Sequence, residues 1–226
     1  MLPLGFIGVC FAAILGSFAN MLIYRLPREL DTVRRRSFCP YCQHVLGVQD
    51  LLPLISYLSS VGRCRYCKHA IGFRYFFVEF FSVGAAVLML HLYGPSLFAL
   101  TGFLLLWVGM TLCFIDMEFQ LLPDVLTLGF AAYALIVAVV QGSGIAHLLT
   151  ALGAASFLLV MAWTASKLLK QDAMGGGDIK WMLAMGAVLG FPKILVGTFL
   201  GFILGAVMAI AAMIFFNLGR RDAIPF

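Results

Sequence analysis

The sequence predicts an all-α polytopic membrane protein with about seven transmembrane helices and one small polar, cysteine-rich domain. Hydrophobic residues make up 63% of the chain and charged residues only 11%, which is more apolar surface than a soluble domain of 226 residues could bury. Long apolar runs, several of them of membrane-spanning length, recur along the chain. Most of the arginines and lysines lie in the short segments between these runs, as in multi-pass membrane proteins.

The membrane helices are predicted from uninterrupted apolar runs. These runs cover about 4–24, 75–92, 96–115, 122–141, 146–166, 179–191 and 194–217. The sixth is short for a span of roughly 20 residues, so we expect it to be tilted or partly re-entrant. The first lacks a basic start and is followed by further spans, which indicates a retained helix rather than a cleaved signal peptide. The predicted division is a first transmembrane helix at 1–27, a polar domain at 28–74 and a transmembrane core at 75–226.

The placement of arginine and lysine predicts the orientation in the membrane. If every apolar run crosses, the basic clusters fall on one side: Arg25, Arg28, Arg34, Arg35, Arg36, Arg63, Arg65, Lys68, Arg74, Lys167, Lys170, Arg220 and Arg221. The opposite side holds Lys193. Cytoplasmic loops carry the excess of positive charge, so the basic side is predicted to be cytoplasmic. The net charge of +5 reflects this bias and attraction to the lipid membrane, and we expect no nucleic-acid partner.

Two Cys-x-x-Cys pairs lie in the polar segment, with residues 43–63 between them. The four cysteines are Cys39, Cys42, Cys64 and Cys67. A two-residue spacer lets each pair grip one tetrahedral ion. The cytoplasm is reducing, which argues against structural disulfides, and a segment this short has little room for a core of its own. We therefore predict a small cytoplasmic zinc-binding domain with these four ligands. A redox dithiol and plain free thiols are the alternatives, and His44 and His69 are either substitute ligands or solvated side chains.

Carboxylates mark the boundary between two apolar runs. Asp116, Glu118 and Asp124 crowd one such boundary, although an ion in hydrocarbon is costly. A fourth carboxylate, Asp178, follows the glycines at 175–177 at the cytoplasmic end of another run. We predict that Asp116 and Asp178 meet at one face of the membrane and together cut a peptide bond. Glu118 is expected to be solvated in the polar turn.

Further residues are candidates for shaping the site or binding substrate. Gly175 and Gly177 allow backbone conformations and close chain approach that other residues prevent. Lys180 either pairs with a carboxylate or anchors at the lipid headgroups. Asp124 follows a proline early in a helix, where a carboxylate interacts favourably with the helix dipole. A structural role is therefore favoured over a role in the site. Glu79 lies about one turn inside a span, where a structural ion pair is favoured over substrate binding.

Four motifs, in order, resemble those of the type IV prepilin peptidases, also called prepilin leader peptidases, which are Gly-x-Gly-Asp intramembrane aspartic proteases. The motifs are Gly16-Ser17-Phe18-x-Asn20 with Tyr24-Arg25-Leu26-Pro27, the paired Cys-x-x-Cys, Asp116 with Leu121-Leu122-Pro123-Asp124, and Gly175-x-Gly177-Asp178-x-Lys180. They span nearly the whole chain. The family often has a histidine where this chain has Phe119. Members usually continue with Gly-Pro and a final membrane helix. The resemblance therefore implies a further helix beyond Ile224-Pro225-Phe226.

The resemblance implies a function. Asp116 and Asp178 would be the catalytic pair that removes the basic leader from prepilins of type IV pili or pseudopilins of type II secretion. The reaction would take place at the cytoplasmic face of the bacterial inner membrane. Many members then methylate the new N-terminus with S-adenosylmethionine, although this sequence shows no methyltransferase fingerprint.

Two other classes of function compete with peptide cleavage. A membrane thiol oxidoreductase would use the Cys-x-x-Cys pairs, but it needs them near the oxidising face, whereas the basic segment places them on the cytoplasmic side. A proton-coupled transporter usually carries its carboxylates near mid-membrane and often has internal repeats. Here the carboxylates lie at one boundary and no transporter-like repeat is evident.

Overall fold

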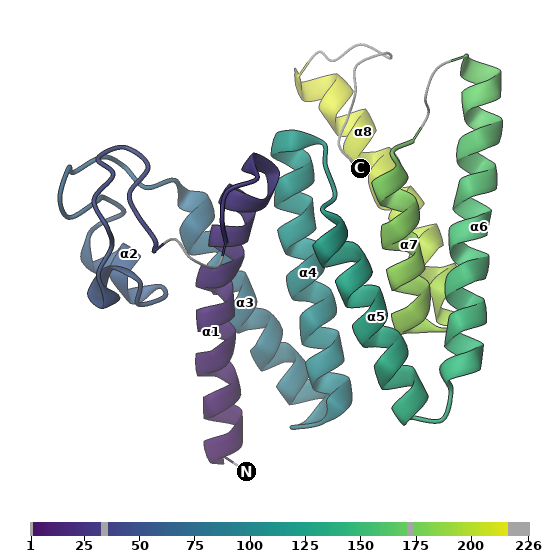
Figure 1. The fold of residues 1–226 in the computed structure, drawn as a ribbon, viewed down its shortest axis with the longest axis horizontal. Coiled ribbons are helices and arrows are strands. Elements are labelled where there is room, and N and C mark those ends of the chain that lie inside the picture. Colours follow the sequence, from purple (N-terminus) through teal and green to yellow (C-terminus); the bar gives the residue numbers. More distant parts are fainter. Residues whose placement is uncertain (1, 33–35, 171–173, 217–226) are drawn as a thin grey trace. The chain divides into compact units, whose positions relative to one another are not determined.

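The computed structural model describes residues 2–32, 36–170 and 174–216, and within these ranges it is helical with no extended strand (Figure 1). The long helices are α1 (Leu2–Arg25), α3 (Phe73–Tyr93), α4 (Leu97–Phe119), α5 (Asp124–Val140), α6 (Gly144–Leu169), α7 (Gly176–Leu189) and α8 (Lys193–Phe216). Each predicted apolar run lies on one of them. Arg34, Arg35, Arg220, Arg221 and the segment Ile224-Pro225-Phe226 lie outside the described residues.

Four helices are long and apolar enough to cross a membrane, counted over the described ranges. They are Gly5–Arg28, which includes the short helix η1 (Leu26–Arg28), Phe73–Tyr93, Leu97–Phe119 and Gly144–Leu168. The apolar helices Asp124–Val140 and Lys193–Val207 are shorter. The 14 residues of α7 extend about 21 Å, against about 30 Å for the hydrocarbon core. The structure therefore supports a multi-pass membrane protein with four candidate spans, where the sequence predicts about seven.

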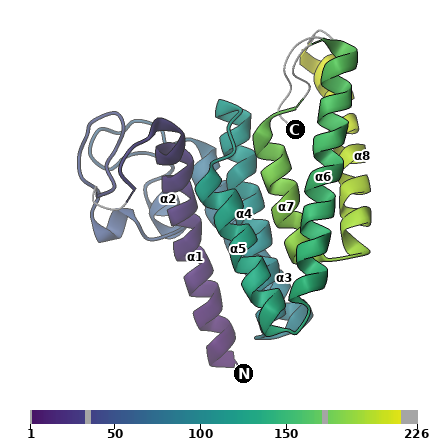
Figure 2. The same ribbon diagram turned by 45° about the vertical axis from the view of Figure 1, so that its right-hand side comes forward.

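Residues 1–115 form one compact unit, in which α1 lies beside α3 and α4 (Figures 1 and 2). The two helices α1 and α3 approach closely at Gly16, because a β-carbon there would lie 2.8 Å from the α-carbon of Glu79. Small residues permit such packing between membrane helices. Trp107 of α4 donates from its indole nitrogen to the Leu15 carbonyl of α1 at 3.0 Å and stacks on Phe18.

Residues 116–226 form the second unit, in which α7 packs against both α5 and α6. The contact with α6 is made by small residues, since a β-carbon on Gly186 would lie 2.7 Å from the α-carbon of Ala151. Near it, the Nδ1 atom of His147 lies 2.7 Å from the carbonyl oxygen of Ala187. The chain reverses at Gly190, which has φ of +64°, and α8 then turns back and contacts α7 over a short stretch, as far as Thr198 and Met182.

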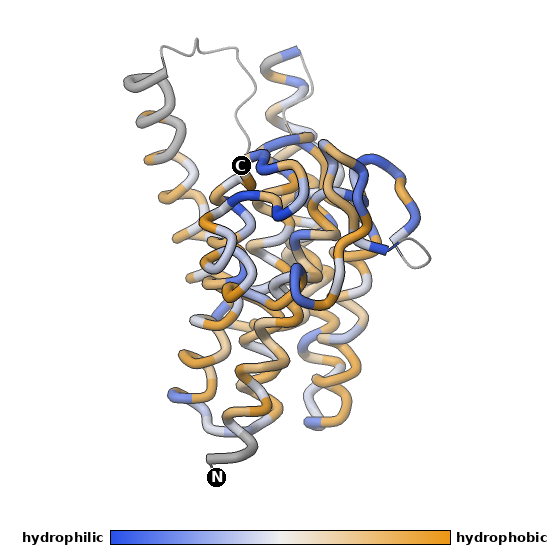
Figure 3. Tube along the Cα trace, turned by 90° about the vertical axis from the view of Figure 1, so that its left-hand side faces the viewer, coloured by the Kyte–Doolittle hydropathy of each residue, from blue (hydrophilic) through white to orange (hydrophobic). Residues whose placement is uncertain are grey.

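The polar segment between α1 and α3 contains little regular structure. It holds the short helices η2 (Val48–Asp50) and α2 (Ile55–Ser59) and two isolated antiparallel bridges. Figure 3 shows hydrophobic residues running along the long helices, while hydrophilic residues concentrate in the connections.

Candidate active site

Asp116 and Asp178 both belong to the second unit and lie at helix ends. Asp116 is in the last turn of α4, because α4 continues to Phe119 rather than ending at 115 as the sequence predicts. The helix ends where the amide of Gln120 donates to the Asp116 carbonyl at 2.9 Å and Gln120 adopts φ of +51°. Glu118 is exposed, as expected, but lies in this last helical turn. Asp178 lies in the first turn of α7.

The two carboxylates share one electrostatic environment. Burial is the largest cause that raises the pKa of Asp178, and the negative charge of Asp116 raises it further. The backbone amide of Gly175 donates to the Asp178 carboxylate and opposes this shift. Both aspartates are only partly buried, so water can reach them. The arrangement favours a pair of acids that hold one proton between them.

The glycines before Asp178 begin α7. Gly175 is the N-cap in an extended conformation, and Gly176 and Gly177 form the first turn. A β-carbon on Gly177 would lie 2.7 Å from the β-carbon of Leu122, whereas one on Gly176 would meet nothing within 4 Å. The predicted approach is that of the substrate backbone, whereas the structure shows a close approach of Gly177 to Leu122, in the turn before α5. Nothing in the local sequence around the glycines identifies this distant partner.

An ion pair joins the first turns of α5 and α7. The Lys180 ammonium lies 2.6 Å from Oδ1 of Asp124, and both side chains are partly exposed. Of the two predictions for Lys180, pairing with a carboxylate is therefore the one that the structure contains. Asp124 follows Pro123 as the first residue of α5, as predicted. One residue after Lys180, Trp181 stacks on Phe130 with ring centroids 6.1 Å apart and strengthens the same helix contact.

Glu79 lies in the first unit and is buried between α1, α3 and the polar segment. Its carboxylate accepts a 2.7 Å hydrogen bond from the amide of Leu54, and the Ser17 side chain also hydrogen-bonds to it. The ion pair expected for Glu79 is not found among the described residues, because hydrogen-bond donors satisfy the carboxylate in place of a cation. Leu54 has φ of +61°, which turns its amide toward the helix. Glu79 therefore connects the polar segment to α1 and α3 through hydrogen bonds.

The four predicted metal ligands converge in the polar segment. The sulfur atoms of Cys39, Cys42, Cys64 and Cys67 all lie within 4.8 Å of one another, and those of Cys39 and Cys67 are 3.9 Å apart. A tetrahedral zinc ion with bonds of about 2.3 Å requires sulfur–sulfur distances of about 3.8 Å. The Cys67 amide donates to the Cys64 sulfur and is the largest cause that lowers the pKa of the Cys64 thiol to about 7, which makes Cys64 the thiolate of the cluster. The His69 amide lowers the pKa of Cys67, but burial and hydrogen bonds with the neighbouring thiols outweigh it and raise that pKa to about 11. The donor set fits a zinc ion.

The two cysteine loops repeat each other in backbone conformation. Cys39 donates from its amide to the His44 carbonyl at 3.0 Å, and Cys64 donates to the His69 carbonyl at 2.9 Å. An isolated antiparallel bridge closes each loop, between residues 38 and 45 and between residues 63 and 70. Gln43 and Lys68 occupy matching positions with φ of +58° and +60°. The two loops are thus two copies of one cysteine knuckle.

The side chains repeat as well. Tyr41 of the first knuckle stacks on His69 of the second, and Tyr66 of the second stacks on His44 of the first. Both histidines are exposed, and their rings lie on tyrosine faces. The pattern Cys-x-Tyr-Cys-x-His occurs twice in the sequence and is the signal that identifies this symmetry.

Two family models together match most of the chain. The bacterial Peptidase A24 N-terminal domain matches residues 10–93, and the type IV leader peptidase family matches residues 103–210. The chain belongs to the type IV leader peptidase family. The four-cysteine cluster and Glu79 lie within the first matched range, and Asp116, Asp124 and the segment 175–180 lie within the second. The family resemblance read from the motifs is confirmed.

Several relatives carry the name prepilin leader peptidase/N-methyltransferase. The protein from Aeromonas hydrophila is 32% identical over 96% of this chain and 83% of its own. The one from Bacillus subtilis is 31% identical over 96% of this chain and 86% of its own. The one from Vibrio cholerae is 35% identical over 78% of this chain and 74% of its own. No solved structure matches this chain.

Proposed function

We propose that this chain is a membrane-embedded aspartic endopeptidase that removes the basic leader peptide from type IV prepilins or type II secretion pseudopilins. Membership of the type IV leader peptidase family and the names of the relatives support the reaction and the substrate class. The assignment of the catalytic pair rests on one observation: the charge of Asp116 acts on Asp178 and raises its pKa. Thiol oxidation and proton-coupled transport have no comparable support.

The mechanism proposed for the pair follows from one shared proton. Double ionisation of two close carboxylates is penalised, so one is protonated while the other is ionised. The ionised carboxylate takes a proton from a water molecule as the water oxygen attacks the scissile carbonyl carbon. The protonated carboxyl donates a hydrogen bond to the carbonyl oxygen. The titration belongs to the pair, and the two roles are therefore not divided between Asp116 and Asp178.

The residues around the pair are proposed to hold it in place. Lys180 and Asp124 join the first turns of α7 and α5 through their ion pair. Gly177 lets α7 lie directly against Leu122, and the Gly175 amide holds the Asp178 carboxylate. Glu79 acts at a separate place, where it positions the polar segment rather than substrate.

The location and topology are proposed from charge. The excess of arginine and lysine on one side of the predicted spans favours the cytoplasmic side for residues 28–74 and for the aspartates. Cleavage would then occur at the cytoplasmic face of the bacterial inner membrane, with α5, α7 and α8 completing about seven transmembrane helices. The polar leader of a substrate would remain in the cytoplasm while its apolar helix lies in the membrane.

Zinc is proposed as a structural ion held by Cys39, Cys42, Cys64 and Cys67. The sulfur geometry supports this role, and thiolate sites of this kind contribute directly to the folding of small domains. The ion would supply folding free energy to a segment with few buried residues of its own, and it takes no part in peptide cleavage.

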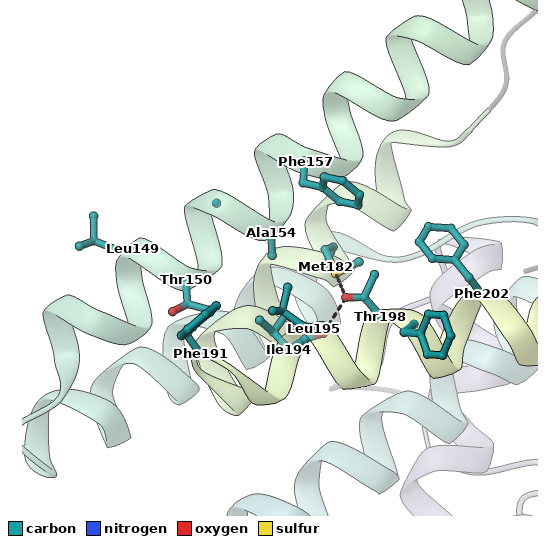
Figure 4. A pocket seen from close by; sticks show the side chains of 12 residues that line it. Leu149, Thr150, Ala154, Phe157, Met182, Phe191, Ile194, Leu195, Thr198 and Phe202 are labelled. Carbon is teal, nitrogen blue, oxygen red and sulfur yellow. Dashed lines mark hydrogen bonds between the residues drawn. The ribbon is translucent and has the colours of Figure 1, made fainter.

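N-methylation of the new N-terminus is proposed on the relatives' names, with S-adenosylmethionine as methyl donor. This donor needs hydrogen-bonding and charged partners for its ribose and amino-acid groups. The cavity among α6, α7 and α8 is lined by apolar side chains and does not fit it (Figure 4).

A cleavage assay tests the proposed function. Detergent-solubilised protein is incubated with a prepilin, and the shortened product and its new N-terminus are identified by mass spectrometry. Cleavage at the junction of leader and apolar helix is expected. An intact prepilin after incubation with folded protein would contradict the proposal and would favour the oxidoreductase or transporter hypothesis instead.

A further inference from the structure

A cavity of about 600 Å³ lies among α6, α7 and α8 (Figure 4). Aromatic rings dominate its wall: Phe157, Phe191, Phe199 and Phe202. The hydroxyls in the lining belong to Thr150 and Thr198, and each donates to a carbonyl of its own helix. The lining therefore offers no free hydroxyl to an occupant. It fits a segment whose own polar groups are already satisfied, as those of an α-helix are in a membrane.

One residue of the cavity wall lies one helical turn from the candidate active site. Met182 lines the cavity and lies one turn after Asp178 on the same face of α7, about 6 Å further along the helix axis. The Thr198 hydroxyl of α8 contacts the Met182 sulfur at 3.7 Å. Phe202 lies one turn after Thr198 on α8, further from the connection at Phe191. The cavity thus extends from the connection between α7 and α8 at Phe191 to within about one turn of Asp178 on α7.

We infer that this cavity is the docking groove for the apolar helix of the prepilin substrate, an inference that builds on the proposed function. Cleavage separates a polar leader from an apolar helix, so the first turns of that helix lie next to the scissile bond and need an apolar surface beside Asp178. The groove walls at residues 149–157 of α6 and 194–202 of α8 each extend about 12 Å, which accommodates about two helical turns.

Docking in this groove depends on packing. Lipid tails are as apolar as the substrate helix, so contact area and fit decide the affinity between membrane helices. A bulky side chain that fills the groove should therefore weaken substrate binding without touching the aspartates. Gly153 lines the groove, and a β-carbon on it would meet nothing within 4 Å, so a larger residue can be accommodated there.

The test compares two substrates and two variants. Gly153→Trp fills the groove, while Gly129→Trp on α5 is the matched control, because a β-carbon there also meets nothing within 4 Å and it does not line the groove. One substrate is a full prepilin, and the other is a soluble peptide that spans the cleavage junction but lacks the apolar helix. For Gly153→Trp, the KM for prepilin should rise about tenfold or more, equivalent to about 1.4 kcal/mol of binding. Cleavage of the peptide by Gly153→Trp should remain within about twofold of wild type. Gly129→Trp should alter the cleavage of neither substrate.

Other results would overturn the inference. An unchanged KM for prepilin in Gly153→Trp would mean that lipid tails occupy the groove. An equal loss with both substrates would mean that the substitution acts through the fold or the aspartates. A photoreactive residue in place of Phe202 should crosslink to the prepilin helix, and crosslinks confined to lipid or to a second copy of this chain would contradict docking. Failure of wild-type protein to cleave either substrate would instead refute the proposed function itself.

Discussion

Gly177 packs so closely against Leu122 that a β-carbon at position 177 would lie 2.7 Å from the β-carbon of Leu122. Real β-carbons do not approach other carbons this closely, so any side chain at 177 must displace the start of α7 or the turn before α5. Asp178 is the next residue, and its carboxylate would move with the displaced turn. The spacing of the two aspartates therefore depends on a glycine.

This contact predicts different outcomes at two adjacent glycines. A misplacement of about 1 Å can cost about 100-fold in rate, so Gly177→Val should lose cleavage, and Gly177→Ala should lose about tenfold or more in kcat/KM. Gly176→Ala should remain close to wild type, because a β-carbon there meets nothing within 4 Å. Zinc content and membrane insertion should persist in all three variants. Equal activity of Gly177→Val and Gly176→Ala would contradict the argument.

The ion pair of Lys180 with Asp124 predicts a mild, rescuable effect. Exposed pairs of this kind contribute about 0.2–1 kcal/mol, so Lys180→Met and Asp124→Asn should each change thermal stability little and retain measurable activity, reduced about two- to fivefold. The double exchange Asp124→Lys with Lys180→Asp should recover part of the loss, which kcat measurements on the single and double variants would reveal. Losses that simply multiply in the double exchange would show that the pair does not position α7.

The raised pKa of Asp178 predicts an unusual dependence of stability on pH. The folded state holds the Asp178 proton more tightly than the unfolded chain does, because burial and the charge of Asp116 disfavour ionisation. Stability from this group is therefore present at acid pH and is lost as pH rises through the folded-state pKa. Asp178→Asn should raise Tm at pH 7, and the gain should shrink as pH falls toward about 4, the ordinary pKa of aspartate. Melting curves in detergent across this range measure it, and a Tm difference that does not vary with pH would count against the shift.

The helices could be predicted from the sequence because apolar runs of this length have few other structures available to them. The helix ends do not follow from apolarity: Asp116 falls within α4 because the helix continues through the polar residues to Phe119. The spacing of the cysteines in the sequence is enough to predict that their side chains cluster. Partners such as Lys180 with Asp124, Gly177 with Leu122 and Glu79 with Leu54 are distant in sequence, and only the fold brings them together.

The cysteine cluster predicts about one bound zinc ion per chain in protein purified without chelator. Replacing Cys39 and Cys42 by serine should remove the metal, loosen residues 28–74 and lower the yield of folded protein more than it changes kcat of the surviving fraction. Cys10→Ser is the control, since Cys10 is an exposed cysteine of α1 outside the cluster. Elemental analysis that finds no metal in the wild-type protein would refute the zinc site.

The most direct test of the account is cleavage of a prepilin by Asp116→Asn and Asp178→Asn. Asparagine keeps the size of each side chain but cannot share the proton, and neither carboxyl can replace the other in the reaction. Each variant should insert into the membrane, fold as judged by its melting transition, and give no shortened product above background. Turnover close to wild type by either variant would show that these two aspartates are not the catalytic pair.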